Sequence, residues 1–296
     1  MINKIDRCDL CGKDVSSSGR VVAKGEFEYY KVKSIVHTVM CKYCKYIFQH
    51  EQFDYKTLTH LYEQDSMACS SNTTNKSDVH REYLIKRQKF ITESIELVLP
   101  PDNKILNILD VGGGDGEITA HLIDRGKIYL TDVSTNDPIH SDIIKVSELF
   151  DEADFPVKFD VIIMNHVLEH VFSPMDFLMR ANSLLTDNGV IIIEVPFELY
   201  TPLFGRIGDW KHVAYFSTSV LRNFLLKAQF NPFHVTLSTG YYGTREIAVI
   251  RAVATKVTNP TDPIDCKSGY LQLLFDILNV KALTLYFSNK IRKLLS

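Results

Sequence analysis

The chain has 296 residues, and 45% of them are hydrophobic, which allows a large buried core in one large domain or two ordinary ones. The formal net charge is −3 and the 33 lysines and arginines are scattered, so the sequence lacks the basic patch of a nucleic-acid-binding protein. No apolar segment resembles an export signal or is long enough to cross a membrane. We therefore expect a cytoplasmic protein with no nucleic-acid partner.

Two Cys-x-x-Cys pairs, separated by 29 residues, lie near the start of the chain: Cys8 and Cys11, then Cys41 and Cys44. Gly12 suits a tight turn, and residues 20–40 are rich in strand formers, which is typical of a zinc ribbon. The competing interpretations are disulfides, which are unusual in a cysteine-poor chain without an export signal, and a redox pair. We expect these four cysteines to bind one structural zinc ion that leaves no coordination position open for catalysis.

A polar linker is expected from about residue 51 to residue 75. A helix over residues 79–99 follows, because apolar side chains recur there at helical spacing. Ser77 or Asp78 is placed to cap this helix, and the prolines at 100 and 101 end it.

Predicted strands and helices then alternate along the chain, which favours a mostly parallel, doubly wound α/β sheet. Ligands of such sheets bind beyond the carboxyl ends of the strands. The predicted strands are residues 105–112, 127–134, 143–149, 159–167, 189–196, 233–239 and 246–254. The predicted helices between them are residues 116–126, 173–185 and 217–230.

The glycine-rich stretch LDVGGGDGE, residues 109–117, follows the first of these strands. It does not fit the dinucleotide pattern G-x-G-x-x-G/A, and no Gly-Lys-Ser/Thr follows as in a P-loop. It does match Asp-x-Gly-x-Gly-x-Gly, and so resembles the first motif of class I methyltransferases that use S-adenosylmethionine (SAM). The matching residues are Asp110, Gly112, Gly114 and Gly116. The alternative is a glycine-rich turn without a ligand.

The chemistry of SAM agrees with this resemblance. SAM has no pyrophosphate, and its sulfonium and amino-acid tail need close backbone approach and a nearby carboxylate. Asp132 lies 22 residues after Asp110, at the end of the next strand, where a carboxylate can accept hydrogen bonds from both ribose hydroxyls. We expect Val133 and Asn165, which also lie at strand ends, to contact the cofactor.

Further segments carry the resemblance from about residue 107 to residue 254. FDVIIMNHVLEHV, LLTDNGVIIIEVP and HVAYFSTSVLRNFLLKAQF resemble the later strands and the His-x-x-x-Phe-Ser element of the superfamily. Together with the cysteine pairs and the linker LTHLYEQD, they resemble methyltransferases with an N-terminal zinc-binding domain from deoxysugar and surface-polysaccharide pathways.

This resemblance implies a Rossmann-like sheet with helices on both faces, a small zinc-ribbon module and a C-terminal helical tail. The expected divisions are residues 1–76 for the module and linker, 77–255 for the SAM-binding domain, and 256–296 for the tail.

Three residues are candidates for catalysis: His212, His166 and Tyr215. His212 is predicted to accept a proton from the acceptor or to orient it, and Tyr215 to hold the ring or the acceptor. The alternative for His212 is a cap on the helix that begins near Ser217. His166 shapes the pocket or moves a proton, whereas Glu169 and His170 are expected to be structural or to form a pocket wall.

The related sugar C-methyltransferases carry Glu-His where this chain has Lys211-His212, which favours O- or N-methylation of a sugar over C-methylation, and of these we expect methylation of a hydroxyl. We expect a sugar, nucleotide-sugar or glycan acceptor. The alternatives are a lipid or quinone-type small molecule, or a SAM-binding partner module without turnover. The apolar tail from residue 269 either packs on the core or a second subunit, which we expect, or lies on a membrane. The sequence does not predict an oligomeric state.

Overall fold

The computed structural model describes residues 2–29, 32–53, 57, 78–99, 104–134, 136–206, 211–242, 245–257 and 269–295. The polar linker predicted from about residue 51 to residue 75 begins with a strand, β5 (Glu51–Phe53), and of its remaining residues only residue 57 is among those described. The Ser77 cap, the two prolines, and the side chains of Cys69, Trp210 and Cys266 lie outside the described residues.

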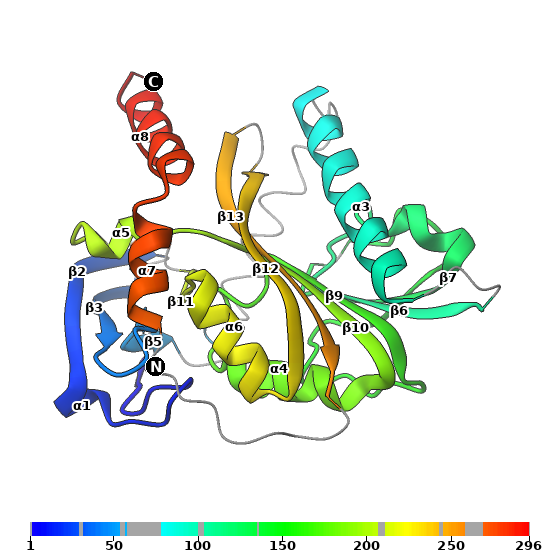
Figure 1. The fold of residues 1–296 in the computed structure, drawn as a ribbon, viewed down its shortest axis with the longest axis horizontal. Coiled ribbons are helices and arrows are strands. Elements are labelled where there is room, and N and C mark those ends of the chain that lie inside the picture. The colour runs from blue at the N-terminus through cyan, green and yellow to red at the C-terminus, as the bar shows by residue number, and fades with distance from the viewer. Residues whose placement is uncertain are drawn as a thin grey trace.

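A seven-stranded sheet forms the centre of the molecule (Figure 1), in the order β12-β13-β10-β9-β6-β7-β8. If these seven strands are numbered along the chain and read from β8, the order is 3-2-1-4-5-7-6. The seventh strand, β13, runs in the opposite direction to the other six. The strands are β6 (Leu106–Val111), β7 (Gly126–Thr131), β8 (Ile143–Ser147), β9 (Phe159–Asn165), β10 (Leu185–Pro196), β12 (Phe230–Tyr242) and β13 (Arg245–Lys256).

Helices cover both faces of this sheet, because its central strands are apolar on both sides. On one face, Ile91 and Ile95 of α3 (Asp78–Val98) pack with Leu122 of the 3₁₀ helix η1 (Ala120–Arg125). On the other face lie α4 (Pro174–Leu184) and α6 (Thr218–Lys227). The arrangement confirms the predicted Rossmann-like α/β fold.

The N-terminal residues form a second, four-stranded sheet in the order β11-β4-β3-β2. Three of its strands come from the start of the chain: β2 (Gly19–Tyr29), β3 (Val32–Cys41) and β4 (Ile47–Gln49). The fourth, β11 (Ala214–Tyr215), comes from the segment after β10. A short helix α1 (Val15–Ser18) precedes β2, and β1 (Ile2–Lys4) pairs with β5 (Glu51–Phe53).

The tail forms α7 (Gly269–Ile277), which packs against α6, and α8 (Val280–Leu295), which packs against β13. Asp276 of α7 accepts a hydrogen bond of 2.7 Å from the backbone N–H of Thr218 at the start of α6. Tyr200, in the short helix α5 (Tyr200–Leu203), donates its hydroxyl to the carbonyl of Ile277 at 2.9 Å. The tail therefore lies against the core, and no helix of the described part of the chain is long and apolar enough to cross a membrane.

Some predicted element boundaries were wrong. The helix expected over residues 116–126 is the shorter η1, because Gly112, Gly114 and Gly116 all adopt left-handed φ values and hold the preceding segment in turns. The last two strands are longer than predicted, since β12 and β13 pair along nearly their whole length. Glu194, at the end of the predicted fifth strand, could from its sequence either be solvated or bind a polar substrate; the structure buries this side chain fully in β10.

Candidate functional site

The glycine-rich turn after β6 is held by the strand beside it. The φ values are +65° at Gly112 and +62° at Gly114, which favour glycine. The N–H of Gly112 donates to the carbonyl of Thr131 at 2.7 Å, and the N–H of Gly114 donates to Asp132 Oδ2 at 2.8 Å. A Cβ added to Gly114 would meet nothing within 4 Å, so a ligand can approach the backbone there.

A cavity of about 530 Å³ opens beyond the carboxyl ends of β6, β7, β8 and β9. Gly112, Asp132, Val133 and His166 line it, in agreement with their predicted positions, and so does His170. The sequence analysis missed the segment that follows β8, which contributes Glu148, Leu149, Phe150 and Asp151. These four residues could have been predicted from the sequence, because they follow the third strand of the sheet as Asp132 follows the second.

Other predicted cofactor residues lie beneath this cavity rather than on its wall. Asp110 is buried and accepts a hydrogen bond of 2.8 Å from the hydroxyl of Thr119. Burial raises the pKa of Asp110 to about 7. Asn165 is also buried, and its side-chain amide has no hydrogen-bond partner among the described residues, which leaves polar atoms for a ligand.

A buried charge cluster lies beside the cavity. Glu194 of β10 accepts from Arg87 Nη2 of α3 at 2.5 Å and from Arg251 Nε of β13 at 2.7 Å. His166, in the left-handed region with φ +54°, places Nε2 3.3 Å from Glu194 Oε1. Burial alone would lower the pKa of His166, but its contacts with Glu169 and Glu194 raise it to about 9. His166 is therefore protonated at neutral pH, which argues against the predicted proton-accepting role.

His212 lies at one edge of this region, with its Nδ1 2.5 Å from Glu198 Oε2. Its ring meets the ring of His170 edge-on, with 4.7 Å between the ring centroids. Because His170 lines the cavity, this contact places His212 immediately behind the wall. His212 does not cap α6, because the hydroxyl of Ser217 accepts the N–H of Val220 there.

The N-terminal sheet holds the His212 segment. The side-chain amide of Gln49, at the end of β4, donates to the carbonyl of His212 at 3.0 Å, and the Gln49 N–H donates to the carbonyl of Val213 at 2.8 Å. The N–H groups of Val213 and Ala214 in turn donate to the carbonyl of Glu169. Tyr215 is buried in β11 opposite Ile47 and is not among the residues that line the cavity, so the structure does not bring it to the predicted place.

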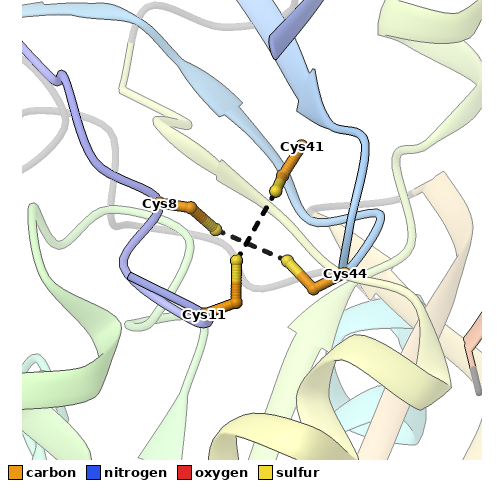
Figure 2. Close-up of side chains that lie close together, drawn as sticks. All are labelled: Cys8, Cys11, Cys41 and Cys44. Carbon is orange, nitrogen blue, oxygen red and sulfur yellow. Dashed lines mark hydrogen bonds between the residues drawn. The ribbon is translucent and has the colours of Figure 1, made fainter. Parts of the chain in front are cut away.

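The four N-terminal cysteines converge, as Figure 2 shows. The sulfur–sulfur distances are 3.4 Å between Cys8 and Cys44 and 3.6 Å between Cys11 and Cys41. Disulfide sulfurs lie about 2.05 Å apart, whereas four sulfurs about 2.3 Å from one zinc ion lie about 3.8 Å apart. The cluster therefore fits a tetrahedral metal ion and not two disulfides.

The two cysteine turns are built alike, which supports a shared ligand. In the first, the Gly12 N–H donates to the carbonyl of Cys8, and in the second the Lys45 N–H donates to the carbonyl of Cys41. Gly12 and Lys45 both have left-handed φ values, +70° and +64°. The first turn also binds the large domain, because Asp9 accepts from the N–H of Met175 at the start of α4 at 2.9 Å.

Comparisons with known proteins identify the family. A family model described as a methyltransferase domain matches residues 83–235. The chain belongs to this methyltransferase family. It is a SAM-dependent methyltransferase.

A solved structure shows the same fold. A methyltransferase from Burkholderia thailandensis that N1-methylates 1,6-didemethyltoxoflavin, with S-adenosylhomocysteine (SAH) bound, is 15% identical and has a TM-score of 0.52; the match covers 79% of this chain and 100% of that one. The N-methyltransferase NodS from Bradyrhizobium japonicum is 15% identical over 65% of this chain and 97% of that one, with a TM-score of 0.48. A comparison with curated protein sequences returned no match.

The residues around the cavity of this methyltransferase fit SAM. Its volume suits a ligand of that size. The open backbone at Gly114, the carboxylate of Asp132 and the unpartnered amide of Asn165 offer the close approach and the polar partners that SAM requires.

Proposed function

We propose that this enzyme transfers the SAM methyl group to a hydroxyl of a sugar, nucleotide sugar or glycan. The observation that carries the proposal is the pairing of His212 with Glu198 directly behind the cavity wall. An edge built from imidazoles and carboxylates suits a polyhydroxylated acceptor better than an apolar quinone or lipid. The buried, ion-paired Glu194 is excluded from contact with the acceptor.

In the proposed cofactor arrangement, Asp132 binds the ribose hydroxyls, and Val133 and Asp151 flank the adenosine. The glycine turn faces the methionine end of SAM, with Asp110 beneath it. Bound SAM supplies an activated methyl group, so the protein must align the acceptor oxygen with the methyl carbon and exclude water.

The transfer forms an oxygen–carbon bond and breaks the sulfur–methyl bond, so that SAM becomes SAH and the hydroxyl proton is lost. We assign the orientation of the hydroxyl, and the promotion of this proton loss, to His212 held by Glu198. The Glu198 contact keeps the proton on Nδ1 of His212 and leaves the lone pair on Nε2.

Carbon methylation beside a sugar ketone is the second candidate, and one observation favours it. The glutamate that is missing next to His212 in the sequence is supplied in space by Glu198. Carbon and oxygen products differ in the NMR signals of the new methyl group, so a ¹³C-labelled SAM methyl distinguishes them directly.

We further propose that Cys8, Cys11, Cys41 and Cys44 bind one structural zinc ion, and that the chain divides into residues 1–76, 77–255 and 256–296. The closed set of four thiolates leaves no coordination position for an acceptor. The zinc site would hold the turn at Asp9 against α4 and would support the sheet that carries Gln49.

The test is SAH formation from SAM with a panel of nucleotide sugars and reducing-end glycans beside a matched panel of quinols and phenolic lipids. We expect turnover with a member of the sugar panel. Turnover with quinols alone would contradict the proposal, and SAM binding measured by calorimetry without any turnover would favour a binding module.

A further inference from the structure

Glu169 is a buried carboxylate that faces the rings of two histidines, His166 and His170. The residue is 1% exposed, and neither carboxylate oxygen accepts a hydrogen bond from the described residues. The nearest ionisable nitrogens are His166 Nδ1 at 3.3 Å and His170 Nε2 at 3.7 Å from Oε1. Buried carboxylates that lack hydrogen bonds are costly, and they are commonly paired with a cation or bound to a metal ion.

His170 lies beside Glu169 and turns the lone pair of one ring nitrogen toward its carboxylate. Nδ1 of His170 lies 3.0 Å from the carbonyl oxygen of Lys211, which can only accept, so Nδ1 carries the proton. In the neutral ring the lone pair is then on Nε2, the atom that faces Glu169. Two electron-pair donors turned toward one another can share one bound cation.

His212 offers a third donor of the same kind. Its Nδ1 is bonded to Glu198, which places the lone pair on Nε2. One ligand atom each from Glu169, His170 and His212 lies within 4.8 Å of the other two. Metal–nitrogen and metal–oxygen bonds of about 2.0–2.2 Å therefore bring all three within reach of one ion after small side-chain movements.

We infer that Glu169, His170 and His212 bind a divalent first-row transition-metal ion. Two imidazoles and one carboxylate are a common ligand set for such ions and leave coordination positions open. The outer contacts that orient metal-binding histidines are also present, as a backbone carbonyl on His170 and a carboxylate on His212. The cysteine cluster, in contrast, has four soft thiolates and no open position.

A second cluster of two histidines and one glutamate differs from the first, because its glutamate, Glu51, accepts hydrogen bonds from the protein. Glu51 accepts from the N–H of His37 at 2.7 Å, and its oxygens lie 3.0–3.1 Å from the Nδ1 atoms of His37 and His50. Its charge is met by the protein itself. Glu51 therefore provides a matched control for Glu169.

The inference deepens the proposed function. It rests on that function in one respect, which is that the acceptor binds beside Glu169, His170 and His212. A metal ion with open positions would bind an oxygen of the acceptor and lower the pKa of a bound hydroxyl, whose proton then passes to water. His212 would orient the acceptor through the ion. Methyl transfer from SAM itself needs no metal, so the ion acts on the acceptor alone.

The test is titration of the full-length, tag-free, zinc-loaded protein with Co²⁺, followed by calorimetry and visible absorption. Co²⁺ binds these ligand types more weakly than Zn²⁺ does, so it should leave zinc in the cysteine site. We expect one equivalent to bind without the charge-transfer absorption of a cobalt–thiolate bond. Glu169→Gln and His212→Ala should abolish this binding, Glu198→Gln should weaken it about 10–100-fold, and Glu51→Gln should leave it unchanged.

Absence of binding by the wild type at millimolar Co²⁺, or binding that survives in both Glu169→Gln and His212→Ala, would overturn the inference. SAH binding at the wild-type affinity shows that each variant is folded, and Glu198→Gln changes a side chain that is 37% exposed, so this variant keeps the buried packing intact. Co²⁺ binding with no turnover on the sugar panel would refute the proposed function and leave the metal site standing. Full turnover on sugars by a wild type that binds no Co²⁺ would refute the metal site and leave the proposed function standing.

Discussion

The cofactor half and the acceptor half of the site are built in different ways. The cofactor half comes from one stretch of chain, residues 110–151, in which each strand end is followed by the residues that line the cavity. The acceptor half combines Glu169 and His170 after β9, Glu198 after β10, and His212 before β11. Its shape depends on contacts between segments that are distant in sequence.

The acceptor half also depends on the N-terminal sheet. Gln49 of β4 binds the backbone of His212 and Val213, and Val213 binds the carbonyl of Glu169. β4 pairs with β3, which ends at Cys41. A structural metal in the cysteine cluster therefore supports the acceptor half through one sheet, whereas the glycine turn and Asp132 are held by β6 and β7.

The largest expected effect is loss of the metal from the cysteine cluster. Cys41→Ser or exhaustive chelation should remove about one zinc equivalent and unfold the N-terminal sheet, because structural zinc contributes on the order of 10 kcal/mol to small modules that fold around it. Turnover should be lost more completely than SAM binding. Metal analysis, thermal unfolding and calorimetry check this expectation.

Cys69→Ser and Cys266→Ser provide the controls for this prediction and should each keep one zinc equivalent. A metal-free protein as stable as the zinc-loaded one would contradict it. Equal loss of SAM binding and turnover would show that the two halves are not supported separately.

The second prediction concerns the cofactor half alone. Gly114→Val should abolish SAM binding, because the new side chain would fill the space open to the ligand at a residue with φ +62°. Gly205→Val is a matched control, since Gly205 has φ +73°, open space around it, and a place outside the cavity. Both variants should lose about 1–2 kcal/mol of stability from backbone strain, and only Gly114→Val should lose SAM in calorimetry.

The third prediction concerns the acceptor half. His212→Ala should lower turnover about 10²–10⁴-fold, the usual range for a group that assists proton loss, with SAM affinity and melting temperature nearly unchanged. His140→Ala, at a solvent-exposed histidine, should have no effect. Near-normal turnover of His212→Ala would remove His212 from the mechanism and direct attention to Glu169.

The sequence was sufficient to predict the strand ends and the glycine turn of the cofactor half because this motif is local. Asp110, the glycines and Asp132 could be placed from strand periodicity and spacing, and the cysteine pairs from their spacing alone. The acceptor half could not be placed, because the contact of His212 with Glu198 depends on how the chain returns after β10, which no local pattern encodes. Arg87 was missed for the same reason, since its partner Glu194 is 107 residues away.

The type of the helix after the glycine turn and the burial of Glu194 could not be predicted from the sequence either. Periodicity suggested an α-helix after the glycine turn, but three left-handed glycines delay the helix and η1 forms instead. A charged residue at the end of an apolar strand, such as Glu194, gives no sign in the sequence that it is buried, yet two arginines from other elements compensate its charge. Compensation of this kind depends on tertiary contacts.

The fourth prediction is a pH dependence in the cofactor half. Burial raises the pKa of Asp110 from 3.8 to about 7 on folding, so the folded state holds a proton that the unfolded state has released. This group should therefore lower stability as the pH rises from about 4 to 7, by on the order of 4 kcal/mol, with no further change above that range.

Asp110→Asn should remove this pH dependence and raise the melting temperature at pH 8, because the amide resembles the protonated acid. The same variant should bind SAM more weakly if the carboxylate faces the amino group of the cofactor. Unfolding measured from pH 4 to pH 8 tests the first part and calorimetry the second. A wild-type stability that rises over this range in step with Asp110→Asn would contradict the assignment.

The smallest expected effect is that of Asp132→Ala. In the protein without cofactor this carboxylate accepts the N–H groups of Gly114 at 2.8 Å and Ser134 at 2.7 Å, and its oxygens retain lone pairs for the ribose hydroxyls. Loss of hydrogen bonds to a charged group should weaken SAM binding by about 1.5–3 kcal/mol, or roughly 10- to 150-fold. Asp132→Asn keeps an oxygen for the Gly114 N–H but loses the charge, so it separates support of the turn from binding of the ribose.

Asp137→Ala, at an exposed acid a few residues further on, should bind SAM normally. If Asp132→Ala also binds SAM normally in calorimetry, the ribose does not lie at the end of β7, and the cofactor half would have to be rebuilt around Glu148 and Asp151.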